Sequence, residues 1–337
     1  MQRTIFVTGG AGFIGSGFVR YLLAAQPGAR VVVFDKLTYA GNLENLAPVS
    51  DDERFRFVRG DVCDADAVRE AMKGCDAVVN FAAETHVDRS ILGPEEFVRT
   101  DVLGTLVLLQ AAEELSARFV QVSTDEVYGD VESGWSSRED DPPRPSSPYS
   151  AAKAGGDLQV LAAVRTFGVN ASITRGSNTY GPNQYPEKVL PLFVTNALDG
   201  QPLPLYGDGR QVRDWLHVED HCAAIELVLR QGEAGEVYNV GAGEEHENVE
   251  LTRLIVDQLG ADDALVRHVE DRAGHDRRYS LDTTKLRSLG WQPRRSWDEG
   301  VRATIDWYRD NRDWWEPIKR SSGYREYYDR QYEARLT

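Results

Sequence analysis

The sequence predicts an α/β fold in which helices cover both faces of a parallel sheet, followed by a smaller α/β substrate domain. Short apolar runs alternate with amphipathic stretches from Thr4 to Ser123, which is the pattern of repeated strand, helix, strand units. The first apolar run is followed by a glycine-rich turn and a helix, the order that opens a doubly wound Rossmann domain. A chain of 337 residues can bury such a core without disulfide or metal staples.

The expected elements follow in chain order. Expected strands are the runs Thr4–Thr8, Val31–Phe34, Phe55–Val58, Ala77–Phe81 and Phe119–Ser123. Expected helices have amphipathic spacing and occupy Ile14–Ala25, Ala65–Met72 and Phe97–Leu115. The segment Asp130–Pro148 is rich in Ser, Pro and acidic residues, so we expect a surface loop there, and it is a candidate lid.

The composition changes near Asn178, where prolines become frequent and the pattern irregular. We therefore expect a dinucleotide-binding domain over residues 1–177 and a substrate domain over 178–337. Two later runs, Asp214–Val218 and Glu236–Val240, have the character of strands that return to the first sheet. Return segments are accordingly expected within residues 210–245.

The charge balance excludes some classes of partner. The chain has 54 acidic and 38 basic residues, a net charge of −16, and such a surface repels nucleic-acid phosphate and anionic lipid. We expect no nucleic-acid and no membrane partner, because no apolar stretch approaches the roughly 18 residues of a membrane span. The three cysteines show neither disulfide nor metal spacing, which favours a cytoplasmic protein.

Two other features suggest functions that we do not expect. His217 and His221 have the spacing of a helical zinc pair, but no Glu follows the first His as in HExxH, so no metal is expected. The stretch Asp306–Tyr332 contains eight aromatic residues, which could stack on nucleic acid. Acidic residues interleave them, so packing against the body of the protein is favoured.

The glycine-rich turn carries the strongest local signal. Gly9 permits the tight turn, Gly12 lets the backbone approach a pyrophosphate, and Gly15 lets the helix pack closely on the strand. Asp35 ends the second strand, twenty residues after Gly15. A carboxylate there accepts the hydroxyls of an adenosine ribose and repels a 2′-phosphate, so NAD is favoured over NADP.

The ends of the third and fourth strands carry weaker signals. Asp61-Val62 occupies the position of contacts to an adenine, and Phe81-Ala82-Ala83 offers small residues where backbone meets a cofactor. Either segment can equally be an ordinary strand end.

Tyr149 and Lys153 lie one helical turn apart, so the phenol and the ammonium share a face. A neighbouring ammonium is expected to lower the pKa of the phenol, which makes a base available near neutral pH. Alone, this pair is more often solvated helix charge. Downstream of a dinucleotide turn and near Ser123-Thr124, it matches the arrangement of the short-chain dehydrogenases/reductases.

Thr124, Asp125 and Glu126 follow a predicted strand at the edge where ligands bind to such sheets. Adjacent carboxylates are commonly just solvated loop charge. At this edge, however, they can serve as a separate acid and base if their surroundings split their pKa values.

Together these motifs resemble the nucleotide-sugar 4,6-dehydratases of the extended short-chain dehydrogenase/reductase superfamily, and among them the dTDP-glucose 4,6-dehydratases. Sugar epimerases of the superfamily are similar in the turn and the Tyr/Lys pair but typically lack the Asp-Glu pair. The resemblance spans nearly the whole chain, over Thr8–Ser16, Asp35–Asn42, Phe81–Ser90, Ser123–Gly129, Tyr149–Lys153, Asn178–Asn183, Tyr206–Asp220 and Asp271–Arg278.

The resemblance implies an internal redox cycle on dTDP-glucose. Tyr149, assisted by Lys153, would take the proton of the 4-hydroxyl while hydride passes from C4 to NAD, and Thr124 would hydrogen-bond the 4-oxygen. Glu126 would remove the C5 proton and Asp125 would protonate the departing 6-hydroxyl. Hydride then returns to C6, so NAD would stay tightly bound through a reaction with no net redox change.

The resemblance also implies the binding residues. Two arginines would bind the diphosphate, although each arginine alone is more often a surface charge and His86 can equally be a packed histidine. The expected cofactor residues are Gly9, Gly12, Phe13, Ile14, Gly15, Asp35, Lys36, Leu37, Thr38, Asp61, Val62, Phe81, Ala82, Ala83, Thr100, Tyr149 and Lys153. The expected substrate residues are His86, Thr124, Asn178, Lys188, Val189, Leu190, Pro204, Tyr206, Arg213, Asn248, Arg272 and His275.

A homodimer is implied as well, with the helices near Phe97–Leu115 and Tyr149–Thr166 packed as a four-helix bundle. Gly155 and Gly156 would permit close helix contact there, at some expense of helix stability. The alternatives are a related dehydratase or 4-epimerase for a UDP, CDP or GDP sugar, and a non-catalytic NAD-binding sensor. A sensor would be expected to have lost part of the Tyr149, Lys153 and acid set.

Overall fold

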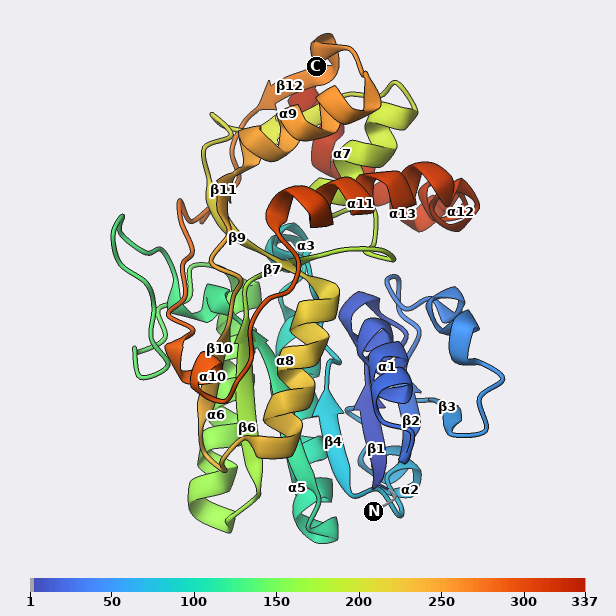
Figure 1. Ribbon diagram of the computed structural model, residues 1–337, viewed down its shortest axis with the longest axis vertical. Helices are drawn as coiled ribbons and strands as arrows, with labels where there is room; N and C mark the ends of the chain where they lie inside the picture. Colours follow the sequence, from blue (N-terminus) through green and yellow to red (C-terminus); the bar gives the residue numbers. More distant parts are fainter. Residues whose placement is uncertain (1–2, 337) are drawn as a thin grey trace.

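A seven-stranded parallel sheet forms the centre of the larger part of the molecule (Figure 1). The structure is a computed structural model that describes residues 3–336. Within that range the strand order is β10-β6-β5-β4-β1-β2-β3. The strands are β1 (Arg3–Thr8), β2 (Ala29–Asp35), β3 (Phe55–Arg59), β4 (Ala77–Asn80), β5 (Arg118–Thr124), β6 (Ala171–Gly176) and β10 (Val237–Val240).

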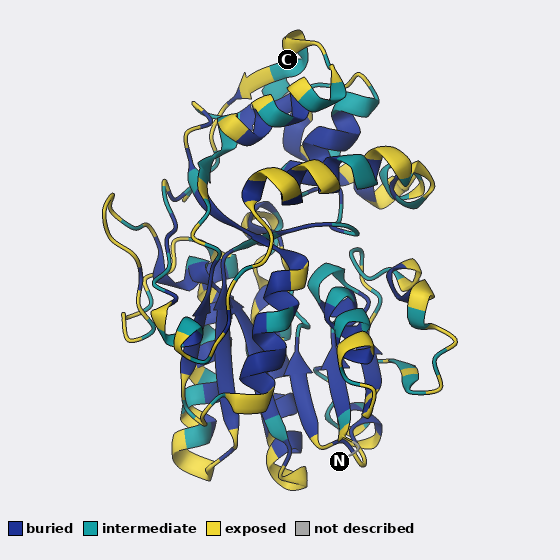
Figure 2. Ribbon diagram, in the orientation of Figure 1, coloured by how far each residue is buried: buried dark blue, intermediate teal, exposed yellow. Residues whose placement is uncertain are grey.

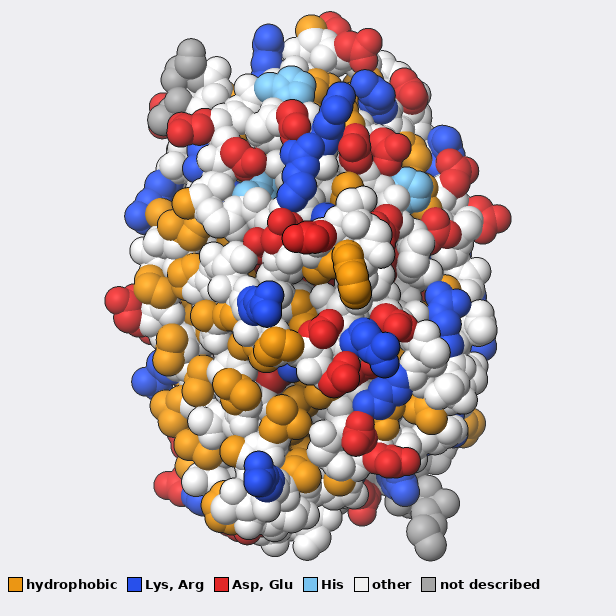
Figure 3. Space-filling model, turned by 90° about the vertical axis from the view of Figure 1, so that its left-hand side faces the viewer, with side chains coloured by type: hydrophobic (Ala, Val, Ile, Leu, Met, Phe, Trp, Pro, Cys, Tyr) orange, Lys and Arg blue, Asp and Glu red, His pale blue; other side chains and the backbone are white. Residues whose placement is uncertain are grey.

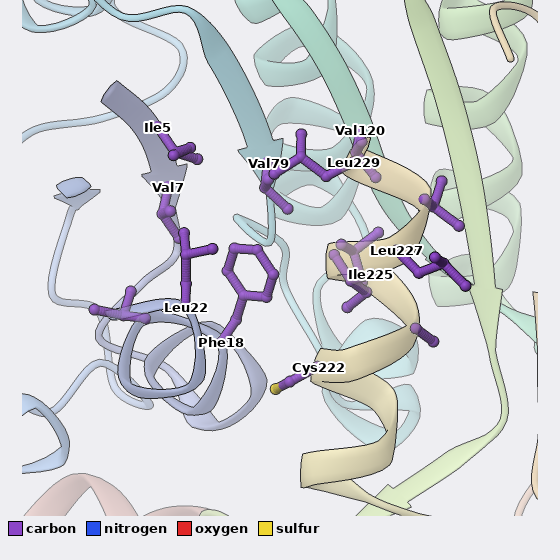
Figure 4. Packing of buried hydrophobic residues seen from close by; sticks show 14 of the residues in the cluster. Ile5, Val7, Phe18, Leu22, Val79, Val120, Cys222, Ile225, Leu227 and Leu229 are labelled. Atoms are coloured by element: carbon purple, nitrogen blue, oxygen red, sulfur yellow. The ribbon is translucent and has the colours of Figure 1, made fainter. Parts of the chain in front are cut away.

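Helices cover both faces of this sheet, which confirms the doubly wound fold. One face packs against α1 (Phe13–Ala25) and α8 (Val218–Gln231), and the other against α2 (Ala65–Ala71), α5 (Thr105–Leu115) and α6 (Pro148–Phe167). Figure 4 shows the first of these cores, in which Phe18 and Ile225 meet the inward side chains of the strands. Both faces of the strands are apolar, as expected where a parallel sheet is covered twice.

The smaller part of the molecule lies beyond the carboxyl ends of the sheet (Figures 1 and 2). It holds a sheet of order β11-β9-β7 and a pair β12-β8. Its strands are β7 (Asn178–Tyr180), β8 (Leu203–Tyr206), β9 (Val212–His217), β11 (Glu245–Glu247) and β12 (Val266–Val269). Its main helices are α7 (Val189–Leu198), α9 (Asn248–Leu259), α11 (Trp297–Asp310), α12 (Arg312–Arg320) and α13 (Ser322–Tyr328).

The aromatic residues near the C-terminus pack inward, as predicted. Tyr308, Trp315 and Tyr332 are buried in the core of the smaller part, and Trp307 and Trp314 pack against it. Short helices complete the chain: α3 (Val87–Leu92), α4 (Glu95–Phe97), α10 (Thr284–Ser288) and α14 (Ala334–Leu336).

One of the two predicted return strands is wrong. Val237–Val240 does return as β10 and pairs with β6. The run Asp214–Val218 does not, because its residues lie mostly in β9, which pairs with β7 and β11. Strand β10 pairs with the side of β6 that faces away from β5, so β6 has no free edge with which β9 could pair. The helix after β9 does return to the larger part, since α8 packs on the first sheet.

Two further predicted segments differ in detail. The predicted helix Phe97–Leu115 contains a π-helical segment, Val98–Gly104, before α5 begins. The acidic segment before α6 is a surface loop, as expected, and it is pinned to residues 278–282: Arg278 donates its backbone N–H to Asp130 Oδ1 at 2.8 Å, and Ser137 donates to the Ser280 carbonyl. Its function as a lid stays a prediction.

No helix within residues 3–336 has the length and hydropathy that a bilayer crossing requires.

Replacing Trp315 by Ala should destabilise the protein. Trp315 is fully buried and donates its indole N–H to the Tyr308 carbonyl at 2.7 Å, and Trp→Ala in a core costs about 3–5 kcal/mol. Urea unfolding followed by circular dichroism measures the loss. Trp135→Ala is the matched control, because Trp135 is 71% exposed on the surface loop, and its effect should stay within about 0.5 kcal/mol. Equal stability of the two variants would contradict the burial of Trp315 in this core.

Candidate active site

One pocket runs along the carboxyl ends of the main strands and reaches the base of the smaller part. The glycine-rich turn, the ends of β2 to β5, the start of α6, the segment after β6 and the residues before α7 all contribute to its wall. Every predicted cofactor residue except Leu37 lies in this wall, as do all five predicted catalytic residues. Leu37 packs instead against the core beneath.

The glycine-rich turn has the geometry that the sequence predicts. Gly9 has φ +62°, and a Cβ there would lie 2.7 Å from the Ala82 nitrogen. A Cβ on Gly15 would collide with the Gly9 carbonyl oxygen. Both positions therefore require glycine, and the turn brings the N-terminus of α1 to the pocket.

The Asp35 carboxyl group is hydrogen-bonded to this turn. Ala11 donates its backbone N–H to one carboxyl oxygen of Asp35 at 2.9 Å, and Leu37 donates to the other at 2.8 Å. Burial raises the pKa of Asp35, and these two donors act in the opposite direction. Beside it, Lys36 pairs with Asp61 at 2.9 Å, so the ends of β2 and β3 are joined at the wall.

Thr124, Asp125 and Glu126 form a tight turn where β5 ends. Thr124 Oγ1 accepts the backbone N–H of Glu126 at 3.3 Å and donates to Asp125 Oδ1 at 3.2 Å. Burial and the charges of Glu126 and Asp214 raise the pKa of Asp125 well above its usual range. The protonated form of Asp125 is therefore favoured.

Glu126 has different surroundings. Burial raises its pKa, whereas the cations Arg272, Lys188 and Arg213 lower it. The two adjacent carboxyl groups thus differ in what opposes their protonation, because three cations favour the charged form of Glu126.

Tyr149 and Lys153 start α6, which a Ser147 capping box begins. Lys153 donates to the Val122 carbonyl at 2.8 Å, and its ammonium lies 3.5 Å from Asp101 Oδ1. The expectation of a phenol with a lowered pKa is wrong for this structure. Burial and the charges of Glu126 and Asp101 raise the pKa of Tyr149 well above its usual range.

The predicted substrate residues divide into two groups. Thr124, Asn178 and Lys188 line the pocket. The others lie outside its wall, in the smaller part of the molecule and in the segment that begins α3: His86, Val189, Leu190, Pro204, Tyr206, Arg213, Asn248, Arg272 and His275.

Asp88 of α3 joins several residues of the second group. It accepts hydrogen bonds from Arg272 at 3.3 Å and from the Tyr206 hydroxyl at 3.1 Å. The His275 ring meets the edge of the Tyr206 ring with 5.9 Å between centroids. These contacts place Arg272 beside the Tyr206 and His275 rings, which form one wall of the smaller part.

Residues near the C-terminus complete that wall. The Tyr327 hydroxyl lies 3.3 Å from His86 Nδ1, and Gln331 donates to the Tyr206 hydroxyl at 2.7 Å. Arg89 is placed between the Tyr39 and Tyr327 rings, 3.9 and 4.0 Å from their centroids.

The other predicted substrate residues outside the pocket wall contact the backbone or the core of the smaller part. Arg213 donates to the Asp276 carbonyl at 2.9 Å. Leu190 is buried in the core of the smaller part with Val189 packed against it. Pro204 belongs to β8, and Asn248 begins α9 by donating its backbone N–H to the Gln211 carbonyl.

Comparison with known proteins agrees with this geometry. The family model described as GDP-mannose 4,6 dehydratase matches residues 6–304. A dTDP-glucose 4,6-dehydratase of Streptomyces niveus is 56% identical over 94% of this chain and 95% of its own. The structure of DesIV, the dTDP-glucose 4,6-dehydratase of Streptomyces venezuelae with NAD and TYD bound, has a TM-score of 0.92 and 56% identity over 94% of this chain and 100% of that one.

The chain belongs to the dTDP-glucose 4,6-dehydratase family.

More distant similarity extends to the epimerases. UDP-glucose 4-epimerase of Thermus thermophilus, in complex with NAD, has a TM-score of 0.85 and 34% identity over 91% of this chain and 99% of that one. The fold is thus common to both activities, whereas the Asp125-Glu126 turn favours a dehydratase.

For this member of the dTDP-glucose 4,6-dehydratase family, sequence reasoning missed several wall residues. Glu84, Ser177 and His221 line the pocket. Ser177 directly follows β6, so the rule that ligands bind at strand ends would have found it had that strand been predicted. Asp88 was not predicted either, because Tyr206 and Arg272, which it joins, are far from it in the chain.

The two histidines have separate environments. His217 caps α8 by accepting the backbone N–H of Glu219 at 3.3 Å, whereas His221 Nδ1 lies 2.8 Å from Thr179 Oγ1. Burial lowers the pKa of His221 to about 4, so its ring is neutral. No group of three potential metal ligands is found in the part of the chain that the structure describes.

Replacing Asp88 by Ala should destabilise the protein strongly. Asp88 is buried beside Arg272, and removing one partner of a buried pair costs about 3–5 kcal/mol because the other charge is left uncompensated. Urea unfolding measures the loss. Asp66→Ala is the control, since the Asp66 side chain is fully exposed beside Arg69 and its loss should change stability by less than about 0.5 kcal/mol. A small effect of Asp88→Ala would mean that Arg272 reaches water without it.

Proposed function

We propose that this chain is a dTDP-glucose 4,6-dehydratase that works with tightly bound NAD. The observation that carries the proposal is the Thr124-Asp125-Glu126 turn, in which Thr124 and Asp125 are buried and which faces the same pocket as the Gly9 turn and Tyr149. Such a pocket brings an acid, a base and a dinucleotide cradle together. Relatives that carry this enzyme name support it, including one whose crystal structure has NAD bound.

The wall fits NAD. Within the described range, buried polar atoms without a hydrogen-bond partner gather along it: Ser123 Oγ, Asp125 Oδ2, Ser177 Oγ, Asn178 Oδ1 and His221 Nε2. A polar ligand would supply their missing partners. The Gly9 turn would hold the pyrophosphate and Asp35 the adenosine ribose. When bound, NAD supplies the hydride acceptor for C4 and the hydride donor for C6 of the sugar.

The protein's own groups then move the protons. Tyr149, assisted by Lys153, takes the proton of the 4-hydroxyl, and Thr124 hydrogen-bonds the 4-oxygen. This step needs the phenolate, which the Lys153 ammonium one helical turn away would favour against the burial and the carboxylates that oppose it. Glu126 removes the C5 proton, a role that needs its ionised form and that the three neighbouring cations favour. Asp125, whose protonated form burial favours, gives its proton to the 6-hydroxyl as water leaves. One proton must afterwards pass from Tyr149 back to Asp125 to restore the starting state.

The cations near Glu126 are proposed to bind the substrate. Arg213, Arg272 and Lys188 each favour the ionised form of Glu126, and their positive charges would also attract a diphosphate to the catalytic turn. Asn178 and Asn248 would add polar contacts. We assign His86, Val189, Leu190, Pro204, Tyr206 and His275 to shaping the nucleotide side, Leu190 and Pro204 through packing.

The chain is proposed to divide into a cofactor domain, residues 1–177, and a substrate domain, residues 178–337, with α8 and β10 returning to the first. We also propose that it works in the cytoplasm, because Cys63, Cys75 and Cys222 are free thiols and free thiols are typical of a reducing compartment.

A second copy of this chain is the proposed partner. Exposed apolar side chains gather on the face shown in Figure 3, over the side of the molecule where α6 lies in Figure 1. Val98, Leu103 and Leu106 come from the π-helical segment and α5, and Leu158 and Phe167 from α6. Two adjacent helices with such faces favour a four-helix interface between two copies.

Incubating the purified protein with dTDP-glucose should yield a product lighter by one water. In deuterated water the product should carry label at C5, because Glu126 returns a solvent-exchanged proton. Mass spectrometry with dTDP-, UDP-, CDP- and GDP-hexoses in parallel measures the preference. A product of unchanged mass would indicate an epimerase. Turnover of a UDP, CDP or GDP sugar but not of dTDP-glucose would mean that the substrate carries that other nucleotide. No turnover of any of these sugars would refute the proposed dehydratase activity.

Replacing Glu126 by Gln should lower kcat for dehydration by at least about 100-fold, within the range that a general base contributes. Reduction of bound NAD at 340 nm should persist, because the first proton goes to Tyr149. Asp140→Asn, an exposed loop carboxylate, should leave both signals unchanged. Dehydration at the normal rate in Glu126→Gln would assign the base elsewhere.

Replacing Leu106 and Leu158 together by Glu should convert a dimer to a monomer, because four buried charges would face each other across the interface. Light scattering after gel filtration measures the mass. Leu43→Glu, an exposed apolar residue away from these helices, is the control and should stay dimeric. If the unsubstituted protein is a monomer, the proposed homodimer is wrong.

A further inference from the structure

His221 on α8 belongs to the pocket wall but has no role in the proton transfers of the proposed reaction. Its side chain is 1% exposed, and its Nε2 atom has no hydrogen-bond partner within the described residues. Such a buried polar atom is costly, because it has lost its hydrogen bonds to water. We therefore expect a ligand in the pocket to supply the partner of this nitrogen.

The end of β6 is shaped around the His221 ring. A Cβ on Gly176, the last residue of β6, would lie 2.5 Å from His221 Cε1 and 2.7 Å from Nε2. Glycine alone leaves room for the ring there, so the Cε1–Nε2 edge lies directly against the backbone where the strand ends. Gly176 and the next residue, Ser177, line the same pocket. The unpartnered nitrogen thus lies at the edge of the sheet where ligands bind.

The contacts of Thr179 on β7 indicate which ring nitrogen carries the proton. Thr179 Oγ1 donates to the Ser177 carbonyl at 3.2 Å and lies 2.8 Å from His221 Nδ1. A hydroxyl has one proton to donate, so His221 Nδ1–H must be the donor to Thr179. This tautomer makes two hydrogen bonds, whereas the other makes one and deprives the Ser177 carbonyl of this donor. Burial lowers the pKa of His221 to about 4, so the ring is neutral and Nε2 is an acceptor.

The position of this acceptor in the sheet indicates which half of NAD lies near it. Asp35, the proposed ribose contact, ends β2, and Gly176 ends β6, with β1, β4 and β5 between them. Four strand spacings of about 4.8 Å place these two ends roughly 19 Å apart. The adenosine half therefore lies away from His221. The nicotinamide half must meet the sugar beside Thr124, which ends the adjacent β5, and its carboxamide is an N–H donor.

We propose that His221 recognises the nicotinamide carboxamide, with Nε2 accepting a hydrogen bond from the amide N–H. The proposal rests on the proposed function, which assigns NAD to this pocket. A neutral ring fixed by Thr179 accepts an N–H but offers no proton to an oxygen. His221 is thus a specificity-determining residue for the amide form of the cofactor. It disfavours a dinucleotide whose ring carries a carboxylate or a methyl ketone, because neither group has an N–H to donate.

The test is a competition between two dinucleotides on the purified full chain. The protein is equilibrated with equal excesses of NAD and acetylpyridine adenine dinucleotide, in which a methyl group replaces the amide NH2, until the bound ratio is constant. After gel filtration, mass spectrometry of the released dinucleotides gives this ratio, which reports the ratio of the two Kd values. We expect NAD to be favoured about tenfold or more, because the analogue leaves the buried acceptor unpaired.

Two variants isolate the contribution of His221. His221→Leu removes the acceptor but keeps a side chain of similar size, so the preference for NAD should fall to within about twofold. His221→Gln keeps an oxygen acceptor at the end of the side chain and should retain part of the preference. His268→Gln replaces an exposed histidine on β12 and should leave the ratio unchanged. Because the ratio compares two ligands on one protein, a general loss of stability does not imitate the effect.

The position of the ring proton can be measured directly. In protein with isotopically labelled histidine, the nitrogen NMR signals that disappear in His221→Leu belong to His221. We expect a proton on Nδ1 and none on Nε2, and an upfield shift of Nε2 when NAD replaces the acetylpyridine analogue. A proton on Nε2 would overturn the proposal, because that nitrogen would then be a donor.

The outcomes distinguish this proposal from the proposed function. A protein that retains neither dinucleotide refutes the assignment of NAD to the pocket, and the proposed function with it. If NAD is retained but binds no better than the analogue, His221 does not recognise the amide, and a ribose hydroxyl or a water molecule is the partner of Nε2. The full preference in His221→Leu would overturn the proposal as well, because another group would then select the amide.

Discussion

The whole active site depends on a sheet that is apolar on both faces. Residues such as Phe6 and Val7 alternate in direction yet are both fully buried, and the polar side chains within the strands, such as Gln121 and Thr174, are buried as well. A ligand therefore reaches this sheet where the strands end. The Gly9 turn, Asp35, Asp61 and the Thr124 turn all occupy those ends, and the chain places the smaller part over them.

Desolvation then determines how the collected charges behave. Burial raises the pKa of Asp35, Asp125 and Glu126 alike, and the neighbours decide how far each can still ionise. Asp125 lies beside further negative charge, which favours its protonated form, whereas three cations favour the charged form of Glu126. This difference is what the proposed roles of the two residues as acid and base require.

Much of this could be predicted from the sequence, for physical reasons that vary by feature. The strands, the Gly9 turn and the Tyr149/Lys153 pair could be predicted because each depends on a few neighbouring residues. The strands follow from the periodicity of apolar residues, the turn from the backbone conformation that glycine permits, and the pair from the spacing of one helical turn. The location of β9 could not be predicted, because the sequence does not show that β10 pairs with β6 at that end of the main sheet. The phenol of Tyr149 was misjudged for a similar reason: burial and distant carboxylates outweigh a neighbour at helical spacing. Asp101, Glu84 and Asp88 become meaningful only when segments far apart in the chain meet.

The contacts of Tyr327 with His86 and of Gln331 with Tyr206 have a consequence for synthesis. The segment that completes this side of the smaller part leaves the ribosome after the other elements that it contacts. A nascent chain can therefore assemble the Gly9 turn and the strand ends first, while these contacts form only when α13 and the residues after it have been translated. Premature termination near Ser321 would release a protein that keeps the Gly9 turn but lacks the contacts of Tyr327 and Gln331.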